Sequence, residues 1–207
     1  MLTVWKRGAA IVRDAGVLCD NFGPPVVVGR LFDTGSERMK AILNLFWQIC
    51  LLRQSPAYVP AHGAFVAAVV VANLIGSVLV SSALDGGVDT LRTATAVIVG
   101  QTATAALVLL ALSLKNLGAR FVTTITAIFG CDLIITACFA AVLPLAIQFG
   151  DAALSVALLG FLVWSVAVAG FILHRALEAP LAVGIGVAMA ISLMSVTFSQ
   201  LAVGPPQ

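Results

Sequence analysis

The sequence predicts an all-α fold: a polytopic membrane bundle of five transmembrane helices preceded by an interfacial amphipathic helix. The 207 residues are 61% apolar and 10% charged, whereas soluble domains are about 45–50% apolar and about 25% charged. The mean hydropathy is +1.11. Five separate apolar runs each reach about 20 residues or more, the length that a helix needs to cross a hydrocarbon core of about 30 Å.

The five apolar runs lie between residues 61 and 201, and each is expected to be a helix because backbone polar groups in lipid must be paired within the protein. The predicted spans are, in chain order, Ala61–Leu84, Leu91–Leu114, Phe121–Phe149, Ala152–Leu173 and Ala179–Gln200. Residues 202–207 form a short uncharged tail. The lipid bilayer is therefore the first predicted partner of this chain.

Charges in the connecting segments predict the orientation of the bundle. Lysine and arginine mark the cytoplasmic side of a membrane protein. They precede the first span and recur in the second loop, with Lys115 and Arg120, and in the fourth, with Arg175. The third loop holds only Asp151. We therefore expect a cytoplasmic N-terminus and a C-terminus on the opposite side.

The segment 39–60 is predicted to form an interfacial helix followed by a linker. Twelve uncharged residues separate Lys40 from Arg53, too few to cross a bilayer. Lys40, Asn44 and Gln48 recur every four residues and form one narrow polar stripe, as in a helix that lies along the membrane surface. A short helix packed against the inner end of the bundle is an equal alternative.

Residues 1–38 mix charges and show no sustained hydrophobic period. One interpretation is a poorly structured cytoplasmic arm. The other is that Met39, directly ahead of Lys40 and the predicted interfacial helix, is the true initiator of the native protein.

A single acidic residue, Asp132, lies near the middle of the third predicted span. An unpaired charge there costs about 2.5–3.5 kcal/mol on insertion scales, so such a carboxyl is expected to be paired, protonated or turned toward a polar cavity. No other predicted span holds a central acidic or basic residue. Asn73 in the first span and Gln101 in the second lie at similar depth and can hydrogen-bond a neutral carboxylic acid.

Three roles stay open for this intramembrane polar cluster of Asp132, Asn73 and Gln101. The first is to join three helices by hydrogen bonds, which the lack of a second titratable group in the spans favours. The second is to bind a partner. The third is transport, with Asp132 serving a proton-coupled step.

Small residues recur at the four-residue spacing that lets membrane helices approach closely. The candidate packing positions are Gly76 in the first span, Gly100 in the second, and Gly184 and Gly186 in the fifth. These positions fit a compact bundle and a homo-oligomer equally well.

Motifs for catalysis, nucleotides, metals and cofactors are missing from the sequence, so none of these is predicted. The four cysteines form no CxxC pair and are interpreted as small apolar packing residues. His174 and Glu178, four residues apart, can pair across a helical turn but are interpreted as part of a solvated loop. The net charge of +2 is too small to indicate a nucleic-acid partner.

Three strings resemble a group of small proteobacterial inner-membrane proteins near the bacterial Yip-type (Ypt/Rab-interacting) membrane domain. They are NLFWQICLLRQSPAYVP, GARFVTTITAIFGCDLII and HRALEAPLAVGI. The resemblance covers about Met39 to Leu201 and implies a non-enzymatic protein of the bacterial inner membrane, with its C-terminus in the periplasm. The acidic-glycine-proline signature of eukaryotic members is absent ahead of the first span, so Rab-GTPase binding is not carried over.

The predicted function is that of a scaffold or accessory subunit of a membrane assembly. It would bind other membrane proteins, or a second copy of itself, through its small-residue faces. The alternative is a small proton-coupled transporter or permease that uses Asp132. An integral-membrane enzyme is the weakest candidate because the sequence holds no catalytic constellation.

Overall fold

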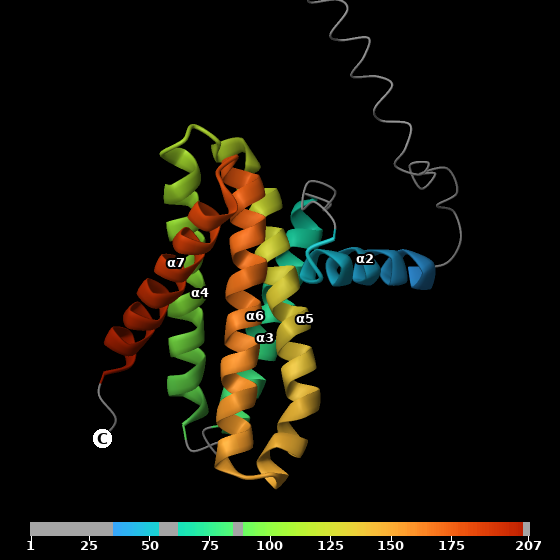
Figure 1. Ribbon diagram of the computed structural model, residues 1–207, viewed down its shortest axis with the longest axis vertical. Coiled ribbons are helices and arrows are strands. Elements are labelled where there is room, and N and C mark those ends of the chain that lie inside the picture. The colour runs from blue at the N-terminus through green and yellow to red at the C-terminus, as the bar shows by residue number, and fades with distance from the viewer. Residues whose placement is uncertain (1–34, 54–61, 85–88, 205–207) are drawn as a thin grey trace, which may run out of the picture. The chain divides into compact units, whose positions relative to one another are not determined.

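The computed structural model describes residues 35–53, 62–84 and 89–204, and these residues form helices without any strand (Figure 1). The predicted all-α fold is confirmed. The helices are α2 (Gly35–Cys50), α3 (Gly63–Leu84), α4 (Thr90–Ser113), η2 (Gly118–Arg120), α5 (Phe121–Gln148), α6 (Asp151–Leu177) and α7 (Leu181–Val203). The chain divides into a unit of residues 1–41 and a compact unit of residues 42–207. Helices α3 to α7 belong to the second unit.

The helices α3 to α7 are each long and apolar enough to cross a membrane, as predicted. Large apolar side chains on their outer faces are exposed, among them Leu79 on α3, Leu159 on α6 and Leu193 on α7. Exposed apolar surface on this scale is the pattern of a helix face that lipid covers. The chain is therefore an integral membrane protein that contacts the bilayer.

The fourth span is longer than predicted. Helix α6 continues to Leu177 instead of ending near Leu173, so the predicted fourth loop is mostly helical. It ends where Glu178 adopts a left-handed conformation (φ 49°, ψ 45°), and Pro180 then stands directly before α7. A left-handed residue and a following proline both stop a helix.

The five spans form a closed ring. Helix α3 packs against α5, α5 against α6, α6 against α7, α7 against α4, and α4 against α3. Successive spans run in opposite directions (Figure 1). Helices α4 and α5 are neighbours in sequence but touch only weakly, so the order around the ring differs from the order along the chain.

The last residues of α2 are buried against α5 and α6. Phe46, Ile49 and Cys50 are 5%, 0% and 1% exposed, and they form one apolar cluster with Cys131 of α5 and Ile172 of α6. Residues 42–50 therefore pack against the bundle, and the predicted position of this helix at the membrane interface stays a prediction. Residues 1–34 and 54–61 lie outside the described residues, and with them most of the predicted arm and linker.

Polar contacts anchor this end of α2. The Cys50 carbonyl accepts a hydrogen bond of 3.1 Å from Trp164 Nε1, which satisfies one of the carbonyls that a helix end leaves unpaired. The Cys50 thiol lies 3.7 Å from the Cys131 carbonyl. About 15 Å of helix separates Phe121, where α5 begins, from Cys131. The contact therefore lies well inside the length of the span.

Candidate functional site

A central cavity of about 360 Å³ is lined by residues of all five spans and is partly open to the surroundings of the bundle. A volume of this size falls in the range of about 300–1,000 Å³ that small-molecule pockets occupy. Its wall is partly apolar and partly polar. The polar lining residues are Ser77, Gln101, Thr104, Asp132, Ser165, Ser192, Ser195 and Ser199.

Asp132 and Asn73, both singled out from the sequence, are brought together. The Asn73 side chain donates from Nδ2 to Oδ2 of Asp132 at 3.3 Å. Asn73 is fully buried, and its other side-chain atom, Oδ1, is buried without a hydrogen-bond partner. This hydrogen bond joins α3 to α5 beside the cavity.

Gln101 lines the same cavity as Asp132 but bonds to a different residue. Its Nε2 donates to the Ser77 hydroxyl at 3.3 Å, which joins α4 to α3. Its Oε1 is buried and has no hydrogen-bond partner. Of the three polar residues predicted to cluster, Asp132 and Gln101 line this cavity, whereas Asn73 is buried behind it and contacts the Asp132 carboxyl.

Helix α7 supplies hydroxyl groups that we did not single out from the sequence. The Ser195 hydroxyl lies 2.8 Å from that of Thr104 on α4, and Ser199 donates to the Ala96 carbonyl at 2.9 Å. Ser192, Ser195 and Ser199 are spaced by three and four residues, so they share one face of α7. This spacing is the pattern from which the polar face could be predicted in the sequence.

Two further cavities adjoin the central one. A cavity of about 450 Å³ between α3, α5 and α6 shares Ser77 and Asp132 with it and is open on the outer face of the bundle, where Leu159 and Leu162 are exposed. Another, of about 330 Å³, includes Arg92 and shares Ala96 and Val97 with it. The last lies at the end of the bundle where α4 begins and α7 finishes. Asp132 therefore stands in the wall between two cavities, and the central one continues toward this end.

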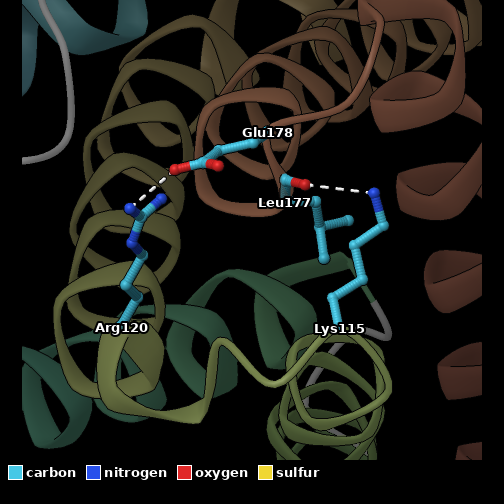
Figure 2. Close-up of polar contacts among 4 residues, drawn as sticks. All are labelled: Lys115, Arg120, Leu177 and Glu178. Carbon is cyan, nitrogen blue, oxygen red and sulfur yellow. Dashed lines mark hydrogen bonds and ion pairs between the residues drawn. The ribbon is translucent and has the colours of Figure 1, made fainter. Parts of the chain in front are cut away.

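Polar contacts close the opposite end of the bundle (Figure 2). Arg120 Nη2 lies 2.7 Å from Glu178 Oε1, and Lys115 Nζ donates to the Leu177 carbonyl at 3.3 Å. Both contacts join the segment between α4 and α5 to the end of α6. Beneath them Leu112 and Leu177 are buried in an apolar cluster. This cluster separates the central cavity from that end.

Glu178 takes a partner different from the one that sequence spacing allows. Its carboxylate pairs with Arg120, while His174 donates from Nδ1 to the Ala179 carbonyl. The physical reason is the left-handed backbone of Glu178. Because this residue ends the helix, its side chain does not continue the helical face that carries His174.

We expect Glu178→Gly to be more stable than Glu178→Gln by about 1 kcal/mol, because both lose the ion pair but only glycine relieves the left-handed backbone. The ion pair itself is exposed on both sides and contributes about 0–1 kcal/mol. Thermal unfolding of both variants in the same detergent measures the difference. Equal melting temperatures would contradict a left-handed Glu178.

The four predicted packing glycines have different surroundings. A Cβ at Gly100 would lie 2.5 Å from the Ser199 hydroxyl, and one at Gly184 would lie 2.5 Å from the Gly170 carbonyl oxygen. At Gly76 the nearest atom, Leu133 Cδ1, would be at 3.4 Å. A Cβ at Gly186 would meet nothing within 4 Å. Gly100 and Gly184 therefore allow close approach of α7 to α4 and α6, and Gly186 lies at no helix contact among the described residues.

Within the described part of the chain, no group of three or more histidine, cysteine, aspartate or glutamate side chains can hold a metal ion. Cys50, Cys131 and Cys138 carry free thiols. No protein-family pattern, curated protein or solved structure matches this chain.

Proposed function

We propose that this chain is a small, non-enzymatic transporter of the bacterial inner membrane whose solute passes through the cavity around Asp132. The observation that supports the proposal is the central cavity, to which every span contributes and which includes one carboxyl group. The resemblance to small Yip-type membrane proteins supports only the five-span arrangement, and no activity is taken from it.

A polar cluster that only joins helices needs no cavity. Protein interiors are packed about as densely as organic crystals, and an empty space costs stability roughly in proportion to its volume. Buried polar groups that serve structure usually satisfy one another or hold a single water. A partly open space of about 360 Å³, lined by Asp132 and by Gln101 with its unpartnered amide oxygen, instead fits a site that a solute occupies for part of the time.

The orientation follows from the positive-inside rule. The end that carries Lys115, Arg120 and Arg175 faces the cytoplasm, and the end where α4 begins faces the periplasm. In this arrangement the central cavity continues toward the periplasm and is closed toward the cytoplasm. Transport then requires that the segment between α4 and α5 separate from the end of α6, so that access alternates between the two sides.

We expect proton movement to accompany transport and to require Asp132. The test uses the full chain in proteoliposomes that trap a pH-sensitive dye. Gradients of amino acids, sugars, organic amines and monovalent cations are imposed in turn, and the internal pH is followed. One class should change the internal pH with the wild type but not with Asp132→Asn, which keeps the size and hydrogen-bonding ability of the side chain.

Asp151→Asn is the matched control because Asp151 is exposed at the start of α6 and lines none of the described cavities. It removes the same charge and should leave the proton movement unchanged. Proton movement that persists in Asp132→Asn would exclude the carboxyl from the step. No response to any class would count against transport.

The scaffold function is the second candidate, and one observation favours it. Ala182, Gly186 and Ala190 are spaced by four residues on α7 and are exposed. A small-residue stripe of this kind lets a helix of another membrane protein approach closely. Purification in mild detergent should then recover a near-stoichiometric membrane partner, or a homo-oligomer, that Gly186→Leu releases. A chain that purifies alone and monomeric would count against this candidate.

A further inference from the structure

We infer that the cavity around Asp132 binds a small organic cation with an apolar body, in exchange for the proton that the Asp132 carboxyl otherwise carries. This inference names the substrate class of the proposed transport function and rests on that function.

The polar groups at the site point to a positively charged ligand. The unpartnered side-chain atom that lines the cavity is an oxygen, Oε1 of Gln101, which is buried and accepts no hydrogen bond. The carboxyl group of Asp132 lines the same space as Gln101. No lysine or arginine lines the central cavity or the adjoining cavity that shares Asp132. A cation with N–H groups would supply the missing donors, and an anion would meet no counter-charge.

The volume and the apolar wall point to an organic cation. A single water takes up about 30 Å³ and a bare metal ion less, which is far below the cavity volume of about 360 Å³. Val97, Phe129 and Ile191 line the cavity beside the polar residues. An ammonium group near Asp132 would therefore leave the rest of the ligand against apolar side chains, where its burial is favourable.

Exchange with a proton follows from the number of titratable groups. Asp132 is the only acidic or basic side chain that α3, α4, α5, α6 and α7 place around the two cavities that share it. The neighbouring Cys131 thiol lies near the Phe46 carbonyl of α2, and Cys138 lines neither cavity. A lone carboxylate in apolar surroundings must be neutralised, either by a proton or by a cation.

The exchange balances in charge and atoms. In the empty state the carboxylic acid is neutral. When the cation binds, the O–H bond of Asp132 breaks, the proton leaves to water, and the carboxylate pairs with the ammonium group. One proton is released for each cation bound, and the reverse step returns the proton when the cation leaves.

Calorimetric titration of the full chain in mild detergent tests the inference with benzylammonium as the cation and benzyl alcohol as its neutral analogue. The titration is run in the neutral to mildly acidic range, where benzylamine stays protonated. Repeating it in buffers of different ionisation enthalpy counts the protons released. We expect protons to be released as the cation binds, and the affinity for the cation to fall as the pH is lowered.

The variants and outcomes separate this inference from the proposed function. Asp132→Asn should bind benzylammonium at least about tenfold more weakly and release no proton, while Asp151→Asn should behave as the wild type. Equal binding of benzyl alcohol, or cation binding by the wild type without proton release, would overturn the inference, and neither result depends on a variant. Coupled movement of another solute class without benzylammonium binding would leave transport standing and this inference wrong. Benzylammonium binding with proton release, but no coupled flux, would support this inference and count against transport.

Discussion

Gly184→Ala is expected to destabilise the bundle by about 1–3 kcal/mol, the usual cost of adding atoms to a close-packed contact. A Cβ at this position would lie 2.5 Å from the Gly170 carbonyl oxygen and 2.7 Å from the His174 nitrogen. Both atoms belong to the backbone of α6, so neither can move aside by changing a rotamer. The two helices would have to separate along their contact, and this would loosen the ring beside the central cavity.

Gly186→Ala is the matched control, two residues away on the same helix. Its Cβ would meet nothing within 4 Å, and alanine is favoured over glycine in a helix by about 1 kcal/mol. Thermal unfolding of the two variants and the wild type is measured in one detergent, with the loss of the monodisperse species as the readout. Gly184→Ala should unfold at a lower temperature than the wild type, and Gly186→Ala at the same temperature or higher. Similar losses in both would contradict the close α6–α7 contact.

Phe46→Ala is expected to cost about 3–5 kcal/mol, the usual range for removing a buried phenylalanine ring. Phe46 is 5% exposed. Its ring lies over Gly130 of α5 and stacks on Phe65 of α3 with the ring centres 6.3 Å apart. Leu43→Ala is the control because Leu43 lies one turn earlier on α2 and is 60% exposed. Its loss should change stability by less than about 0.5 kcal/mol.

A double substitution makes this test specific to the contact. In the wild type, a Cβ at Gly130 would collide with the Phe46 ring, so Gly130→Ala should destabilise the protein. In the Phe46→Ala background the same change should cost little, because the ring is gone. Equal costs of Gly130→Ala in both backgrounds would contradict the contact, and a harmless Phe46→Ala would place α2 outside the folded unit.

The five spans were predictable because one physical constraint acts locally on each. A helix that crosses the bilayer must be apolar over about 20 residues and must pair its own backbone groups. Both requirements can be recognised from consecutive residues, so α3 and α5 begin and end within two residues of the predicted spans. The predicted end of the fourth span was too early because His174 and Arg175 are polar, as residues in a loop commonly are. Their charge says nothing about the backbone, which turns only at Glu178.

The site was partly predictable. Asp132 and Asn73 are conspicuous in apolar runs because polar groups in a membrane span are costly, and the structure joins them by a hydrogen bond. Ser195 and Thr104 are less conspicuous, because a hydroxyl can bond to the carbonyl one turn back and needs no partner helix. Their value to the site depends on which helices face each other.

The sequence by itself determined that this protein is helical, that it has five spans, and that a carboxyl group lies near the middle of one of them. Each of these follows from the cost of placing polar groups in lipid, which depends on local composition. Tertiary structure alone decided that α7 closes the ring between α6 and α4, that the end of α2 packs at Gly130, and that a cavity opens beside Asp132. These depend on the shapes of side chains that are far apart in the chain, because in lipid the helices associate by close packing and interhelical hydrogen bonds, with little help from the hydrophobic effect.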